Sequence, residues 1–209
     1  MIAFVPDRAS WPFAPGEGPF RIKGTAYRGH LDFVAEEVPG GIEGMLAAMD
    51  APLAAFFRGT FLAASLYDVM PLVLAAAPCA KAMGLSAPDF VARRSRAQAP
   101  KDLTGVYRFL LAMVPTRTVA KKLPQLFTQI LDFGKAEITR DAPGEVDATI
   151  SGVPAAICPW LCTVVSSYGE AALQTSGAKR ASIVAAPVSS AGEAHGVALA
   201  GASLKVRWA

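Results

Sequence analysis

The chain has few of the residues that bind metals or form cross-links: three cysteines and two histidines in 209 residues. An odd, small number of cysteines argues against a disulfide framework and fits a reducing cytoplasm. Cys158 and Cys162 are four residues apart, but no second Cys/His pair completes the four ligands that a structural zinc ion needs. We interpret the two as small buried side chains, rather than as a redox or metal pair, and we expect no metal.

Charge is also scarce. Charged residues make up 18% of the sequence, hydrophobic residues 53%, and the formal net charge is only +3. The basic residues are spread along the chain, apart from Arg93, Arg94 and Arg96 and a Lys121-Lys122 pair. This mild imbalance does not form the basic patch of a nucleic-acid-binding protein. We interpret the arginine cluster as a solvated helix face, with an acidic partner as the alternative.

A long uninterrupted apolar run is missing as well. Residues 61–84 are largely apolar, but Asp68, Pro71, Pro78 and Lys81 interrupt them. A charge in the middle of a bilayer costs roughly 2.5–3.5 kcal/mol on insertion scales, so the stretch favours a buried helix. The N-terminus lacks the basic and apolar regions of a signal peptide. The sequence therefore predicts a cytoplasmic protein without a membrane span.

Catalytic and phosphate-binding signatures are absent from the sequence. It contains no Gly-Lys-Ser/Thr, no Gly-x-Gly-x-x-Gly between a strand and a helix, and no Gly-x-Ser-x-Gly. His30 precedes Asp32 and Glu36, but these spacings do not bring the side chains together on a helix, and a solvated face is the simpler interpretation. His195 lies in a polar loop that we expect to be exposed. We therefore predict no catalytic residues and no cofactor.

What the sequence does contain is a strong pattern in residues 116–154. Apolar residues recur at helical spacing, which predicts an amphipathic helix with Pro124 inside it; they are Val119, Leu123, Leu126, Phe127, Ile130 and Leu131. After Gly134 the period changes to two, which predicts strands over 135–141 and 145–150, joined by a turn at Ala142-Pro143-Gly144.

The rest of the chain is interpreted in the same way, from apolar periodicity and from proline and glycine positions. Residues 1–19 are predicted to form an irregular arm, with Trp11 and Phe13 lying on the body of the fold. Helices are predicted over 30–38, 42–49, 65–83, 86–97, 100–114 and 154–175, and a turn or short helix over 53–58. Strands are predicted over 20–27, 181–186 and 197–208, with a polar loop over 187–196.

This order of elements predicts one α+β domain over residues 20–209, preceded by the 1–19 arm. Its helical part covers 28–133 and its sheet module covers 134–209. The helical N-terminal layer packs with an antiparallel strand-strand-helix-strand-strand module, whose sheet has one face against helices.

The same order, together with Gly24, Gly134, Ile150-Ser151-Gly152 and Gly177-Ala178, resembles known groups of proteins. The chain looks like an uncharacterised family of myxobacterial proteins of about 200 residues. More remotely, it is similar to the haem-nitric-oxide/oxygen-binding (H-NOX) domains and to 4-vinyl-reductase-type small-ligand domains.

The H-NOX resemblance would imply a haem with a proximal histidine and a Tyr-x-Ser-x-Arg clamp on its propionates. The sequence has no Tyr-x-Ser-x-Arg, and neither histidine lies on a central helix near residues 116–154. We therefore expect no haem bound in that way. The 4-vinyl-reductase resemblance would imply a hydrophobic cavity for a small or lipid-like molecule.

We expect such a cavity between the helices of residues 61–74 and 103–131. Its candidate ligand-binding residues are Tyr67, Asp68, Met70, Tyr107, Leu111 and Phe127. Asp68 lies within an apolar stretch, so it either faces solvent on the polar side of a helix or pairs with Lys81, Arg58 or a ligand.

The leading hypothesis is a non-enzymatic domain that binds a small apolar or lipid-like ligand for sensing or regulation. The alternative is an interaction or structural protein with a filled core, a protein partner or a homo-oligomer interface. An enzyme of unfamiliar type is third, with Asp68, Tyr67 and His30 as its first candidate residues.

Overall fold

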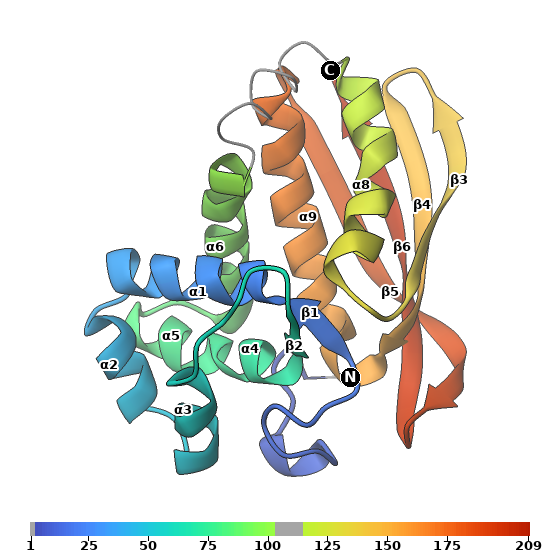
Figure 1. The fold of residues 1–209 in the computed structure, drawn as a ribbon. Coiled ribbons are helices and arrows are strands. Elements are labelled where there is room, and N and C mark those ends of the chain that lie inside the picture. Colours follow the sequence, from blue (N-terminus) through green and yellow to red (C-terminus); the bar gives the residue numbers. More distant parts are fainter. Residues whose placement is uncertain (1–2, 103–114) are drawn as a thin grey trace.

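The computed structural model describes residues 3–102 and 115–209. The chain forms a helical half and a half in which helices lie against one face of a curved sheet (Figure 1). The predicted α+β class and the strand-strand-helix-strand-strand order of the second half are confirmed.

The helical half contains short elements around a small two-stranded sheet, with Trp11 of the arm buried in the core, as predicted. Strands β1 and β2 pair antiparallel, with Ile22 opposite Tyr67. The elements, in order, are η1 (Arg8–Ser10), β1 (Arg21–Lys23), α1 (Gly24–Glu37), α2 (Gly41–Ala47), α3 (Ala51–Phe57), β2 (Leu66–Asp68), α4 (Met70–Leu74), α5 (Ala76–Ala82) and α6 (Ala87–Asp102).

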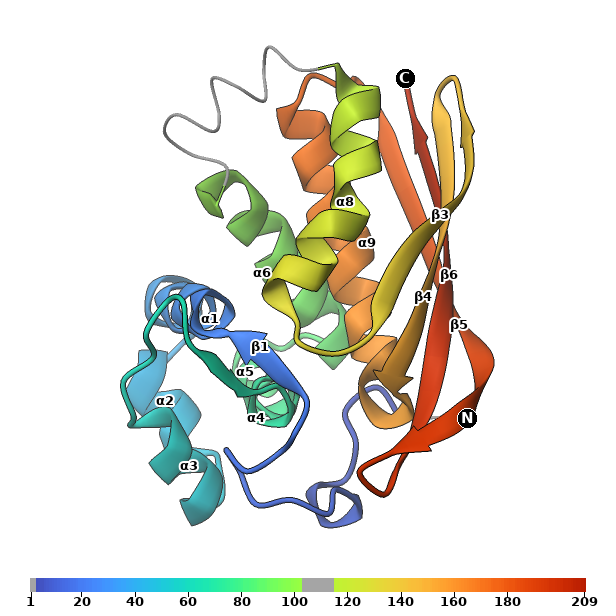
Figure 2. The ribbon, with the colours of Figure 1, turned by 45° about the vertical axis from the view of Figure 1, so that its right-hand side comes forward.

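The second half is built on an antiparallel sheet with the strand order β3-β4-β6-β5. Helices α8 and α9 cover the same face of this sheet, and α6 packs along α9 (Figures 1 and 2). The elements, in order, are α8 (Thr116–Ile130), β3 (Lys135–Ala142), β4 (Glu145–Pro154), η2 (Ala155–Ile157), α9 (Cys158–Thr175), β5 (Ala181–Ala194) and β6 (Val197–Trp208).

Helix α8 follows the predicted apolar stripe. Val119, Phe127 and Leu131 are buried, and Pro124 lies within the helix without ending it. The predicted hairpin after it is confirmed, since Ala142 pairs with Glu145 across the turn. Burial of one face of α8 against the sheet explains why this pattern is the clearest in the sequence.

Two predictions in the helical half are wrong. The predicted strand over 20–27 ends at Lys23, and α1 begins at Gly24, whose N–H donates to the Ser65 carbonyl at 2.8 Å. The predicted helix over 65–83 begins instead with strand β2, followed by the two short helices α4 and α5. Three-residue strands are too short to produce a distinct period, so apolar content alone suggests a helix.

Two further boundaries also differ from prediction. Helix α6 runs through Pro100 as far as Asp102, the last described residue of this part of the chain, since one proline removes only one backbone hydrogen bond. Strand β5 extends through the predicted loop over 187–196 as far as Ala194. The rest of the predicted helix over 100–114 lies outside the described residues.

Within residues 3–102 and 115–209, no single helix has the length and apolar character needed to cross a bilayer. The bent pair formed by residues 70–82 and 87–102 meets those criteria only when its helices are taken together across a bend of 103°.

Candidate functional site

A cavity of about 160 Å³ lies between the sheet and helices α6, α8 and α9. Most of its walls are apolar. The sheet contributes Ala136, Val146, Ala148, Ile150, Ile183, Leu204 and Val206. The two covering helices contribute Ala120, Leu123, Pro124, Leu126, Phe127, Ile130, Leu131, Trp160, Leu161, Val164, Val165 and Gly169. A purely apolar cavity of about 150 Å³ holds a molecule the size of benzene, which gives the scale of this space.

Polar side chains are concentrated on the wall formed by α6. Arg94, Gln98 and Asp102 follow one another at intervals of four residues, so they share one face of the helix, and Ser95 lies beside them. Tyr168 of α9 and Thr25 of α1 are the other polar residues of the described lining, which also includes Ile22 of β1 and Ala26 of α1. The stripe runs from buried Arg94 through half-buried Gln98 to exposed Asp102, and therefore connects the cavity with the surface.

Arg94 is the unusual member of this stripe, since only 6% of the residue is exposed. Among the described residues it has neither a hydrogen-bond partner nor an ion-pair partner. Burial lowers the pKa of its guanidinium to about 10, against the opposing effect of Asp102 and Cys79. Ser95 is 1% exposed, and its hydroxyl has no hydrogen-bond partner within the described part of the chain.

The Asp102 carboxylate is held by neutral groups rather than by Arg94. The Gln98 amide donates to its Oδ1, and the Tyr168 hydroxyl donates to its Oδ2 at 3.2 Å. Desolvation raises the pKa of Asp102, while these two hydrogen bonds and the Arg94 charge lower it. No hydrogen bond to a described residue therefore occupies the Arg94 donors, which can bind another group.

The predicted solvated face of the arginine cluster is correct for two of its three members. Arg93 and Arg96 are exposed and pair with Glu37 at 2.7 Å and Glu170 at 3.5 Å. Arg94 is the correction, because it points inward onto the cavity wall. No local signal in the sequence separates Arg94 from its neighbours, because an arginine on a charged helix is usually exposed.

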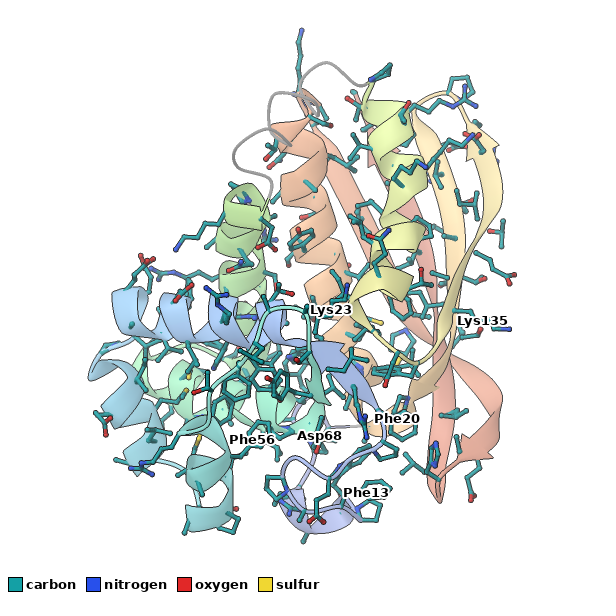
Figure 3. All side chains as sticks on the ribbon, viewed as in Figure 1. Phe13, Phe20, Lys23, Phe56, Asp68 and Lys135 are labelled. Carbon is teal, nitrogen blue, oxygen red and sulfur yellow. The ribbon has the colours of Figure 1, made fainter. Side chains whose placement is uncertain are left out.

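Of the six candidate ligand-binding residues, Phe127 lines the cavity. Tyr67, Asp68 and Met70 do not line it; they lie in the helical half, on β2 and at the start of α4. Figure 3 shows Asp68 near Phe56 in that half, away from the sheet strand that carries Lys135. Tyr107 and Leu111 lie outside the described residues. The second wall of the cavity is thus α6 and α9, rather than the predicted helix of residues 61–74.

Asp68 is neither exposed, as the simpler interpretation has it, nor paired with Lys81 or Arg58. It is 2% exposed, and its carboxylate accepts backbone N–H groups of Gly16 at 3.2 Å, Gly18 at 3.1 Å and Met70 at 3.0 Å. Burial raises the pKa of Asp68, and the three N–H donors act in the opposite direction. Asp68 therefore fastens the N-terminal arm to the start of α4.

Both histidines lie away from the cavity lining. His30 is 1% exposed on α1, between the rings of Phe57 and Phe90, so its predicted solvated position is wrong. Its Nε2 has no partner among the described residues, and burial, reinforced by the Arg94 charge, lowers its pKa to about 3. His195 is exposed at the β5–β6 turn, as predicted, with its ring edge on Phe20.

The three cysteines are buried thiols, and Cys158 donates to the Gly201 carbonyl at 3.2 Å. No group of three or more His, Cys, Asp or Glu side chains in the described parts of the chain is arranged to hold a metal ion. The cavity lining from those parts includes no His, Cys or Met, and its single tyrosine hydroxyl is bound to Asp102. These residues do not fit a haem, whose iron needs an axial ligand of one of these types.

Comparison with solved structures identifies the fold. The unliganded Fe(II) H-NOX protein from K. algicida has a TM-score of 0.55 with 8% identity, and the match covers 90% of this chain and 97% of that chain. An oxygen-binding H-NOX domain related to soluble guanylate cyclases has a TM-score of 0.59 with 9% identity, covering 90% of this chain and 95% of that one. A Tt H-NOX variant with one phenylalanine replaced by leucine has a TM-score of 0.59 with 10% identity and the same coverage.

No protein-family model and no curated protein matches the chain. With identities near 10%, the structural matches establish the fold alone. The protein is thus an α+β domain in which a helical half meets a helix-covered antiparallel sheet. More specifically, it has the fold of H-NOX domains, as the remote resemblance predicts.

Proposed function

We propose that this protein binds a small, mainly apolar molecule in the cavity between α6, α8, α9 and the sheet, and that it acts as a cytoplasmic sensory or regulatory domain. The observation that carries this proposal is the cavity itself, at about 160 Å³ and with mostly apolar walls. Such volumes are uncommon in close-packed interiors, where voids larger than a water molecule are few. The solved structures with this fold include an oxygen-binding H-NOX domain, which supports a small-ligand role.

The proposed ligand is not a haem bound through its iron, since the lining residues within 3–102 and 115–209 supply no suitable axial ligand. Binding therefore depends on shape and on the burial of apolar surface. The resemblance to 4-vinyl-reductase-type domains agrees with this interpretation, and it stays a prediction, like the resemblance to the myxobacterial family.

The alternative, an interaction protein with a filled core, has weaker support. The large exposed apolar side chains among the described residues are spread over several elements. Leu62 lies before β2 and Leu66 within it, Ile138 lies on β3, and Val184 and Val188 lie on β5. Strands β3 and β5 are opposite edges of the sheet. Interfaces between stable partners usually require a larger continuous apolar area.

Two measurements test the proposal. Native mass spectrometry of gently purified protein, compared with the denatured chain, should show a small-molecule adduct and will also give the oligomeric state. Calorimetric titration with 1-octanol should show binding that Val164→Trp weakens at least about tenfold, because the larger ring fills the cavity beside α9. The control is Val184→Trp, the same change at a residue that is 59% exposed on β5.

An unchanged 1-octanol affinity in Val164→Trp, with a native circular dichroism spectrum, would place binding elsewhere and reject this site. A bare native mass, together with no heat of binding from 1-octanol in the wild type, would reject ligand binding. A bare mass in a defined oligomer would then favour the interaction protein.

A further inference from the structure

We propose that the molecule held in this cavity is a small carboxylic acid in its ionised form, bound through its carboxylate to Arg94 and Ser95, with its apolar body against the sheet. This inference rests on the proposed function and specifies the chemical class of its ligand. It follows from two buried polar groups on the cavity wall that have no partners among the described residues.

The first group is the Arg94 guanidinium. Arginine stays charged in proteins, and a buried charge without a partner is very unfavourable. Arg94 is only 6% exposed, and although the Asp102 charge acts on it electrostatically, the described residues form no hydrogen bond or salt bridge with it. Its forked donors match the two oxygens of a carboxylate, which is the best partner for a guanidinium in a low-dielectric site.

The second group is the Ser95 hydroxyl, an independent observation on the next residue. It is 1% exposed, lines the same cavity and has no hydrogen-bond partner within the described residues. Most buried hydroxyls in proteins find a partner, so an unpaired one beside a cavity points to a ligand atom that accepts a hydrogen bond. A carboxylate supplies such an acceptor next to Arg94.

The surrounding charges favour one negative charge on the ligand. Arg94 is the only cation among the described residues that line the cavity, and it is faced by the Asp102 carboxylate farther along α6. A carboxylate places one negative charge at Arg94, whereas a doubly charged phosphate would bring a second negative charge and more repulsion from Asp102. His30 and Cys79, which also lie close enough to interact electrostatically with Arg94, are buried and neutral at physiological pH, because their pKa values are shifted to about 3 and about 12.

The cavity volume limits the rest of the molecule. A space of about 160 Å³ suits an apolar body of roughly six to ten non-hydrogen atoms, by comparison with a benzene-sized cavity. A short alkyl chain or a single aromatic ring fits this limit. Long-chain fatty acids and haem exceed it.

Octanoate and 1-octanol provide the test, because they have nearly the same apolar body and differ in charge. Isothermal titration calorimetry at pH 7.5 should show that the wild type binds octanoate at least about tenfold more tightly than 1-octanol, the lower limit expected for hydrogen bonds to a charged group. Arg94→Met should abolish this preference and leave 1-octanol binding in place. Arg93→Met, which removes an exposed arginine one residue away, is the matched control.

Arg94→Met is expected to remain folded, because it replaces an unpaired buried charge with an apolar chain. Ser95→Ala provides a second variant, with an octanoate affinity reduced about threefold or more and an unchanged 1-octanol affinity. Equal affinities of the wild type for octanoate and 1-octanol would overturn this inference and leave the proposed function intact. Octanoate binding that is unaffected in Arg94→Met would do the same, whereas a wild type that binds neither probe would overturn both.

Discussion

The buried polar side chains of this protein obtain their partners in different ways. Asp68 receives three backbone N–H donors from its own chain. His30 is accommodated as a neutral ring between phenylalanines. Arg94 has no partner within the described chain, and this difference separates a structural charge from a ligand-binding one. Each case leads to a different experimental result.

Asp68→Asn should lower the free energy of unfolding by about 1–3 kcal/mol, because an amide NH₂ would replace one oxygen that accepts backbone N–H groups. The side chain at position 68 has little room to move away from Gly18, because the two are so close that a Cβ on Gly18 would overlap the Asp68 carboxylate. Urea unfolding followed by circular dichroism measures the change. Asp32→Asn, at an exposed residue of α1, is the control and should be neutral. Equal stabilities of the Asp68 variant and the control would contradict this structural role.

His30 makes stability depend on pH in a defined direction. Its pKa is about 3 in the folded protein and about 6.5 in the unfolded chain, so the unfolded chain binds more protons between these values. The free energy of unfolding should therefore fall as the pH is lowered from about 6.5, by up to about 1.4 kcal/mol per pH unit from this residue.

His30→Leu should remove that contribution, so the variant loses less stability than the wild type between pH 7 and pH 5. Urea unfolding at several pH values within this window gives the two slopes. Val184→Ala, a change at a residue that is 59% exposed and carries no ionisable group, should keep the wild-type slope. Parallel curves for the wild type and His30→Leu would mean that His30 is not held neutral in the fold.

At the scale of elements, the β5–β6 hairpin shows how a turn extends a sheet. His195 and Gly196 both have positive φ, 53° and 74°, and the pairing continues up to Ala194 opposite Val197. Two consecutive positive φ values are typical of the tight turns whose twist matches paired strands. This turn positions β5 and β6, two of the four strands behind the cavity.

Gly196→Val should destabilise the protein by about 1–2 kcal/mol, because a β-branched residue is strained at a φ of 74°. Space is not the cause, since a Cβ at Gly196 would have no neighbour within 4 Å. Ala198→Val, two residues away on an exposed part of β6, is the control and should be neutral or slightly stabilising. Equal midpoints of thermal unfolding for the two variants would show that the positive φ at Gly196 does not disfavour a β-branched residue, and would contradict this prediction.

The elements that the sequence predicts well are those with long amphipathic patterns, such as α8 and the β3–β4 hairpin, because half of each faces solvent. The errors concern elements whose positions depend on distant partners. Strand β2 exists because β1 pairs with it, and β5 continues past Pro187 because β6 lies alongside. Neither partner can be recognised from local periodicity.

The cavity is harder to predict than the fold. Phe127 belongs to the strongest apolar stripe and is a candidate from the sequence alone. Arg94 and Ser95 are not, because arginine and serine on a charged helix are usually exposed. Their burial depends on α9, which packs on α6 from more than fifty residues away. Asp68 stands out as a charge in an apolar stretch, but its partners are backbone groups of the arm, which composition does not reveal.

For the whole molecule, the cavity lies where the main elements of the sheet half meet α6 of the helical half. A ligand that contacts α6, α8 and the sheet together would stabilise their mutual arrangement. A sensory or regulatory domain would transmit a signal through a change in the arrangement of these elements when the ligand binds.

Binding inside this cavity is the central claim, and methyl NMR tests it most directly. Protein with ¹³C-labelled Ala, Val and Leu methyl groups is mixed with 1-octanol, and intermolecular NOEs are recorded. We predict NOEs from the alkyl chain to methyl groups of Ala148, Val164 and Leu204, which line the cavity from β4, α9 and β6. NOEs confined to exposed Val184 and Val188, or the absence of NOEs at saturating 1-octanol, would contradict the claim.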